Sequence, residues 1–386
     1  KIMIISRIQG FDWFAFAPGE MHKGLSEMID KNFAPANAWY GADGDNYIRG
    51  LAGLVRDGLF STEGKLSYWP AGYPLLMWPL LIIFKSFFFF ALTFLQSLLY
   101  AISCAFFVDE IYKSRLKKFA IPLILFLTFN PTLALNTIAV GYELPTLSLS
   151  LIAIAAMLRN FRLSHEKVIS SELVIAAASF GLASFMQPRL IVVAVGVFFL
   201  WAFAKYRLIF SVLFIVFSLA IVAIAPVTLI WRNSKANGFA AVSTNLGTTM
   251  NIGAGPNATG GYTNKATGVN CPKIEGNAAN QDRALVRCVL KWYLSNPISS
   301  LKLAVNKSIY FWSPWFGPLA NGTMARNPWR INHPLSETIK SESGFNFVYG
   351  AAGKLISGVW MIFNLVILFF GFLVLWWQYL LSFLIG

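Results

Sequence analysis

The sequence predicts an all-α polytopic membrane protein. Three observations predict it: 56% of the 386 residues are hydrophobic, only 12% are charged, and the mean hydropathy is +0.60. An ordinary soluble domain carries roughly twice that share of charged residues. The formal net charge of +14 would suit nucleic acid. However, the Lys and Arg residues gather in short segments between apolar runs, which is typical of membrane topology. We therefore expect no nucleic-acid partner.

Residues 1–85 precede the first clear span and are rich in aromatic side chains, which favour the membrane interface. We expect them to form the first extracytoplasmic loop with juxtamembrane helices. Apolar residues at 47, 48, 51, 54 and 55 recur with a helical period that stops at Gly58. This helix would begin near Asp43 and Asp45, where the helix dipole favours ionised carboxylates. A short helix over 75–84 follows.

A transmembrane helix bundle is predicted over 86–230, and its apolar segments fall at about 86–108, 119–135, 144–158, 170–187, 190–204 and 208–230. Several are short for a span of about twenty residues, so we expect some to be broken or tilted. The basic turns at 113–118, 159–167 and 205–207 fall on one side, which the positive-inside rule makes cytoplasmic. The alternate turns and the first loop then lie outside.

The stretch 231–354 is predicted to be a large extracytoplasmic loop with a helix near 281–294, and residues 355–386 a C-terminal transmembrane helix. Because the chain begins at Lys1 and ends within an apolar run, we expect further helices beyond both ends. Cys271 and Cys288 share the large loop, where oxidation is allowed, and they predict a disulfide.

Asp43-Gly44-Asp45 resembles the short acidic pattern with which nucleotide-sugar enzymes bind a divalent metal. Those enzymes bind the nucleotide in the cytoplasm, whereas this loop is expected outside. An EF-hand is excluded because Leu54 and Arg56, not Glu, stand eleven residues after the two Asp residues. We predict no metal site and no certain cofactor, and a divalent metal at this pair is the disfavoured alternative. Two carboxylates in a loop favour acid–base chemistry instead, and the simpler alternative is a turn with a helix cap.

The order of these segments resembles the multi-spanning glycosyltransferases of the GT-C fold class that use polyprenyl-phosphate sugars. They include protein O-mannosyltransferases and lipid A aminoarabinose transferases. In that family an Asp of the first extracytoplasmic loop stands four residues before a Tyr that begins a helix, as Asp43 does before Tyr47. The segment 69–76 is similar to the family's Pro-rich approach to the next helix. Residues 231–233, 242–245 and 256–262 resemble a stretch of bacterial members. Gly44 stands where the family often has a second acidic residue, and Trp69 where it often has Lys.

The resemblance implies a GT-C-like bundle that transfers a sugar from a polyprenyl-phosphate donor to an extracytoplasmic protein, lipid or glycan, with inversion. The attacking hydroxyl needs a carboxylate base, and we assign that role to Asp43, with Asp45 assisting. The leaving lipid phosphate needs cations, for which the candidates are Arg189, Arg232 and Lys65. Interfacial anchoring is the alternative for the two Arg residues. The substrate-binding candidates are Tyr47, Glu143, Asn257 and Tyr262, and for the last three a turn is the alternative.

The expected partners are the lipid-linked donor, the acceptor and the bilayer, and the expected location is the bacterial inner membrane, with the active site facing outward. Three alternatives stay open. A polymerase or ligase of lipid-linked oligosaccharides would use a pyrophosphate donor without Asp43. A flippase or transporter of lipid-linked sugars predicts charged residues within spans or repeated broken helices. For a purely structural subunit, the Asp pair would be incidental.

Overall fold

The computed structural model describes residues 43–129, 133, 136–137, 140–163, 168–260 and 268–312, and scattered residues between 359 and 373. Within these ranges the chain forms helices joined by turns, and they contain no strand. The all-α architecture is therefore confirmed for this part of the chain. The chain divides into two compact units, residues 1–245 with 276–280 and residues 246–275 with 281–386.

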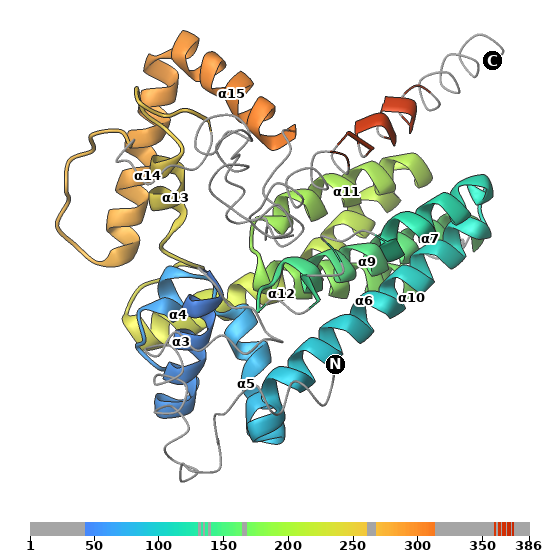
Figure 1. The fold of residues 1–386 in the computed structure, drawn as a ribbon, viewed down its shortest axis with the longest axis horizontal. Helices are drawn as coiled ribbons and strands as arrows, with labels where there is room; N and C mark the ends of the chain where they lie inside the picture. Colours follow the sequence, from blue (N-terminus) through green and yellow to red (C-terminus); the bar gives the residue numbers. More distant parts are fainter. Residues whose placement is uncertain are drawn as a thin grey trace, which may run out of the picture. The chain divides into compact units, whose positions relative to one another are not determined.

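The first unit contains the apolar helices (Figure 1). Their bounds are α3 (Asp43–Asp57), α4 (Lys65–Tyr68), α5 (Gly72–Phe84), α6 (Phe88–Tyr112), α7 (Ala120–Phe129), α9 (Glu143–Leu163), α10 (Ser171–Met186), α11 (Leu190–Lys205) and α12 (Leu208–Asn237). Two 3-10 turns, Lys85–Phe87 and Lys117–Phe119, precede α6 and α7. Each predicted apolar segment between 86 and 230 thus contains a helix, and most of the segment 119–135 after Phe129 lies outside the described residues. The helix expected to end at 230 continues to Asn237, where Gly238, with φ of 70°, ends it.

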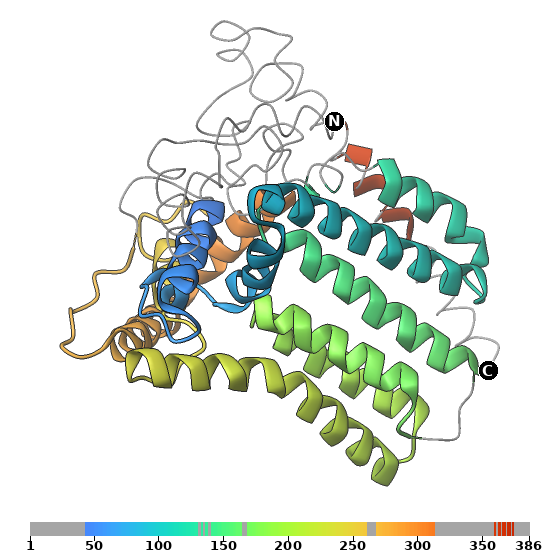
Figure 2. The same cartoon turned by 90° about the horizontal axis from the view of Figure 1, so that it is seen from below.

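Small side chains let these helices pack closely. Ala153 and Ala156 of α9 lie in one buried cluster with Ala176 and Ala177 of α10. Lipid tails are as apolar as these side chains, so the hydrophobic effect does not drive helices together within a membrane. Close packing of the helices, which small side chains allow, stabilises their association instead. α10 accordingly packs against α9, α11 and α12, and α9 also packs against α6 (Figures 1 and 2).

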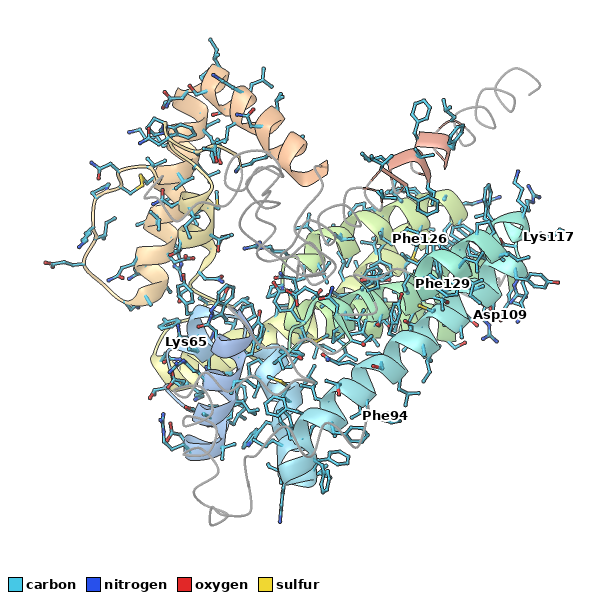
Figure 3. All side chains as sticks on the ribbon, in the orientation of Figure 1. Lys65, Phe94, Asp109, Lys117, Phe126 and Phe129 are labelled. Carbon is cyan, nitrogen blue, oxygen red and sulfur yellow. A yellow bond between two sulfur atoms is a disulfide. The ribbon has the colours of Figure 1, made fainter. Side chains whose placement is uncertain are left out.

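Three described helices, α6, α9 and α12, are long and apolar enough to cross a membrane. α5, α10 and α11 are apolar but shorter, and α10 and α11 have 16 residues each, as the short predicted segments suggested. Large apolar side chains cover the outer faces. Phe94 of α6 points away from the bundle (Figure 3) and is 53% exposed, and Phe129 of α7 is 71% exposed. Exposed apolar surface on this scale suits lipid, so the first unit is built for association with a membrane.

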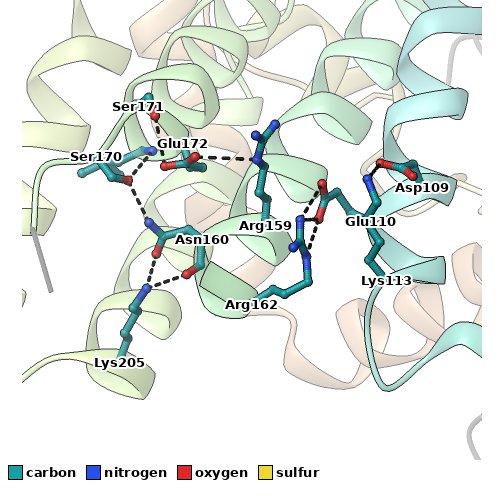
Figure 4. Close-up of polar contacts among 11 residues, drawn as sticks. Asp109, Glu110, Lys113, Arg159, Asn160, Arg162, Ser170, Ser171, Glu172 and Lys205 are labelled. Carbon is teal, nitrogen blue, oxygen red and sulfur yellow. Dashed lines mark hydrogen bonds and ion pairs between the residues drawn. The ribbon is translucent and has the colours of Figure 1, made fainter. Parts of the chain in front are cut away.

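Charged side chains gather at one end of this bundle (Figure 4). Arg162 of α9 donates to both carboxylate oxygens of Glu110 on α6, over 3.0–3.2 Å. Lys205 at the end of α11 donates to the backbone carbonyl of Asn160 at 2.7 Å. Arg159 lies 3.8 Å from the Glu172 carboxylate of α10. The basic turns predicted to share one side therefore share one end of the bundle.

The second unit contains α13 (Leu246–Ile252), most of α14 (Ala278–Ser295) and α15 (Pro297–Trp312). The helix expected over 281–294 is α14. The expected disulfide is present between Cys271 and Cys288, and it ties the loop before α14 to the middle of that helix. Residues 1–42 and most of the span expected over 355–386 lie outside the described residues.

Candidate functional site

Tyr47 is the centre of a buried aromatic cluster in the first unit. The apolar period of α3 turns Tyr47 inward, together with Ile48 and Leu51, and Tyr47 is only 1% exposed. Its ring makes edge-to-face contacts with the rings of three other residues, Trp69, Tyr73 and Tyr142, with centroid distances of 6.3, 5.3 and 5.8 Å. We call these four residues the aromatic cluster.

The Trp69-Pro70-Ala71-Gly72-Tyr73 turn brings two rings of the aromatic cluster together. Trp69 ends α4 and Tyr73 lies in the first turn of α5. Gly72 makes this possible, because a Cβ at this position would overlap the backbone carbonyl of Phe185 at the end of α10. The start of α5 therefore lies directly against α10.

Tyr73 connects the aromatic cluster to two further segments of the chain. Its hydroxyl donates to Gln96 Oε1 of α6 at 2.9 Å and accepts from the backbone N–H of Gly141 at 3.1 Å. Gln96 in turn donates to the Thr137 carbonyl at 3.3 Å. The position of Tyr73 is thus fixed by hydrogen bonds as well as by packing.

Polar groups surround the cluster where α9 begins and α10 ends. Glu143 is the first residue of α9, and a Cβ on Gly141 would collide with its carboxylate. Gln187, directly after α10, donates to the Tyr142 hydroxyl at 2.8 Å. The buried indole N–H of Trp69 donates to no residue that the structure describes. Leaving a buried donor without an acceptor costs free energy, and an acceptor oxygen on a bound molecule would remove that cost.

Helix α3 begins at Asp43, so position 43 lies one helical turn before Tyr47 on the same face. The side chains of Asp43 and Asp45 lie outside the described part of the structure. The backbone nevertheless sets both residues in the first turn of α3, where the helix dipole favours carboxylates. Among the described side chains, no group of three metal-ligating residues occurs.

Two of the three predicted cations lie close to this region in the chain. Arg189 is exposed at the N-terminus of α11, two residues after Gln187. Lys65 begins α4 (Figure 3). Its ammonium lies 6.0 Å from the ring centroid of Tyr68, whose ring contacts Trp69. Both remain candidates for binding a phosphate.

Arg232 has a different place from the one expected. Its guanidinium is buried and donates to the backbone carbonyls of Leu59 at 3.1 Å, Leu66 at 3.3 Å and Ser61, and to Asn233 Oδ1 at 2.8 Å. All these acceptors belong to the protein itself. We therefore interpret Arg232 as a clamp that holds residues 59–66 against α12, and we leave it out of the candidate phosphate site.

The remaining predicted residues belong to the second unit. Asn257 is exposed in the loop after α13, and Tyr262 lies outside the described residues. The aromatic cluster, by contrast, is formed by the first unit alone. Sequence reasoning did not identify Gln187, although its place just before Pro188-Arg189 at a helix end was a usable signal.

No protein-family model, no curated protein and no solved structure matches this chain.

Proposed function

We propose that the chain is an integral membrane glycosyltransferase with a GT-C-like bundle. It would transfer a sugar from a polyprenyl-phosphate donor to an extracytoplasmic acceptor, at the inner membrane of a bacterium. The observation that carries the proposal is the start of α3. Asp43 opens a helix whose next turn bears Tyr47, the centre of a buried aromatic cluster at one end of an apolar bundle.

In the proposed reaction Asp43 accepts the proton of the acceptor hydroxyl as its oxygen attacks the anomeric carbon. The new carbon–oxygen bond forms as the bond from the anomeric carbon to the phosphate oxygen breaks, which inverts the configuration. The polyprenyl phosphate leaves with the bonding electron pair. Arg189 and Lys65 would stabilise the negative charge that develops on it.

Two rings of the aromatic cluster, those of Trp69 and Tyr142, are only partly buried, and together with the polar neighbours they would bind the sugar. Aromatic faces pack against the apolar faces of a sugar ring, while Glu143 and the amide of Gln187 are of the types that bind sugar hydroxyls. The buried indole N–H of Trp69 offers one more donor. The apolar packing around Tyr47 would exclude water, which would otherwise compete with the acceptor.

The test is sugar transfer by purified protein in detergent, from a panel of polyprenyl-phosphate sugars. Wild type is compared with Asp43→Asn, Asp45→Asn and the control Asp57→Asn, whose carboxylate pairs on the surface with Arg56. We expect Asp43→Asn to lose about 10²–10⁴-fold in transfer rate, the usual contribution of a general base, with donor binding retained. The control should keep the wild-type rate.

Equal transfer by wild type and both site variants would refute the assignment of the base. If no donor is consumed but labelled lipid-linked sugar crosses proteoliposome membranes, the enzyme proposal fails and a flippase takes its place. Consumption of pyrophosphate-linked donors alone, unaffected by Asp43→Asn, would indicate a polymerase or ligase.

A further inference from the structure

The helices α14 and α15 form a hairpin in the second unit (Figure 1). Large aliphatic side chains are exposed at its turn. Leu294 at the end of α14 is 82% exposed, Ile298 at the start of α15 is 84% exposed, and Leu301 is 68% exposed. Neither helix is among the candidate membrane spans of the described residues. Single exposed apolar residues are ordinary, but a continuous exposed patch marks a contact surface.

The exposed side chains lie on one face of each helix. On α14, Leu290 and Leu294 are four residues apart, and on α15 the set Ile298, Leu301 and Val305 follows an i, i+3, i+7 pattern. The other faces of the same helices are used for the core, since Val289 is 0% and Leu303 4% exposed. Each helix thus has a buried apolar face and a second apolar face directed outward. We call the five exposed residues the hairpin tip.

The turn that presents the hairpin tip is held by a network of hydrogen bonds. The backbone N–H and side-chain amide of Asn296 donate to the Trp292 carbonyl at 3.0 and 2.9 Å. Ser300 donates to the Tyr293 carbonyl at 2.9 Å, and Lys307 donates to the Tyr293 hydroxyl at 3.2 Å. The exposure of the tip is therefore built into a fixed turn.

Basic side chains border the hairpin tip. Arg287 precedes it on α14, Lys291 and Lys302 lie between its residues on α14 and α15, and none of the three forms an ion pair with a residue that the structure describes. An apolar face bordered by Lys and Arg is typical of helices that lie in the membrane interface and contact anionic lipids.

We propose that the hairpin tip inserts into the interface of a lipid bilayer, with Arg287, Lys291 and Lys302 bound to anionic headgroups. A second copy of the chain fits this surface less well. In a twofold dimer the same patch faces itself, which would bring these cations toward their own copies. The proposal does not depend on the glycosyltransferase function.

The experiment uses the full chain in lipid nanodiscs, with Cys104→Ala so that an added cysteine can be labelled alone. A bimane fluorophore is attached at Leu294→Cys or Ile298→Cys, and at Gln281→Cys as the control, an exposed position on another face of α14. Each disc holds one copy of the protein and lipids that carry a nitroxide quencher. We expect loss of most of the fluorescence at 294 and 298, and little loss at 281.

Equal quenching at all three positions would overturn the proposal. So would protection of position 294 from aqueous iodide that appears only in discs with two copies, because that result identifies a dimer contact. The charge is tested with Lys291→Gln combined with Lys302→Gln. Quenching at 294 should then fall in phosphatidylglycerol discs and stay constant in phosphatidylcholine discs, and no difference between the two lipids would overturn the role of the anionic headgroups.

Discussion

Replacing Arg232 by Met tests whether this residue is a clamp. The substitution removes the Arg232 donor from the buried backbone carbonyls of Ser61 and Leu66 and from the partly buried carbonyl of Leu59. An unsatisfied buried acceptor costs about 1–3 kcal/mol, and removing a buried cation offsets part of that sum. We therefore expect a net loss of roughly 3 kcal/mol, which corresponds to a melting temperature lower by about 6–12 °C.

The assay is thermal unfolding of the protein in nanodiscs, with limited proteolysis to report on residues 59–66. Arg207→Met is the matched control, because Arg207 is exposed just before the same helix, α12. Its melting temperature should stay within about 2 °C of wild type, as for most surface substitutions. If Arg232→Met melts with the control and residues 59–66 stay protected, the clamp does not exist as described.

Three further predictions concern packing, the disulfide and pH. Gly72→Ala forces α5 away from α10 and should destabilise the first unit by about 1–3 kcal/mol, whereas Gly196→Ala, in open space on α11, should be neutral or stabilising in the same thermal melts. Reduction of Cys271–Cys288 removes about 3 kcal/mol from the second unit, seen as faster proteolysis, and unchanged cleavage contradicts this. Burial raises the pKa of Asp282 above its usual 3.8. Protonation of Asp282 therefore favours the folded state. Its contribution to the free energy of unfolding is fully present below pH 3.8 and is lost as pH rises through the raised pKa. Asp282→Asn should reduce this change of the unfolding free energy with pH, measured by urea titrations at several pH values and monitored at α14. The same pH dependence in variant and wild type would refute it.

The helices were predictable because their signals are local. The apolar period of α3, the Pro188 that follows α10 and the apolar runs of α6 and α12 act over a few residues, so their positions follow from the sequence. The clamp was not predictable. Arg232 meets carbonyls more than 160 residues earlier in the chain, and a carbonyl has no sequence signature.

The aromatic cluster lies between these two cases. Tyr47 and the Trp69–Tyr73 turn are visible as separate signals, and each was identified from the sequence. Their contact with Tyr142 and Gln187 depends on how α3, α5, α9 and α10 pack, which no local pattern encodes. Sequence therefore gives the types of residue in the site but not the complete set.

The clamp also changes how a loss of activity at Arg232 must be interpreted. Residues 59–66 lead directly to Trp69, which contacts Tyr47, one helical turn from Asp43. A variant that frees this segment would disturb the proposed site even if Arg232 itself binds no phosphate.

Arg232→Lys separates the two roles. Lys keeps the positive charge that a phosphate needs, but it lacks the planar fork that reaches several carbonyls at once. If Arg232 is a clamp, Arg232→Lys should lower the melting temperature and speed the proteolysis of residues 59–66. If Arg232 is a phosphate ligand, the retained charge should leave the melting temperature and that protection close to wild type. Measuring both quantities on the one variant therefore decides between the roles.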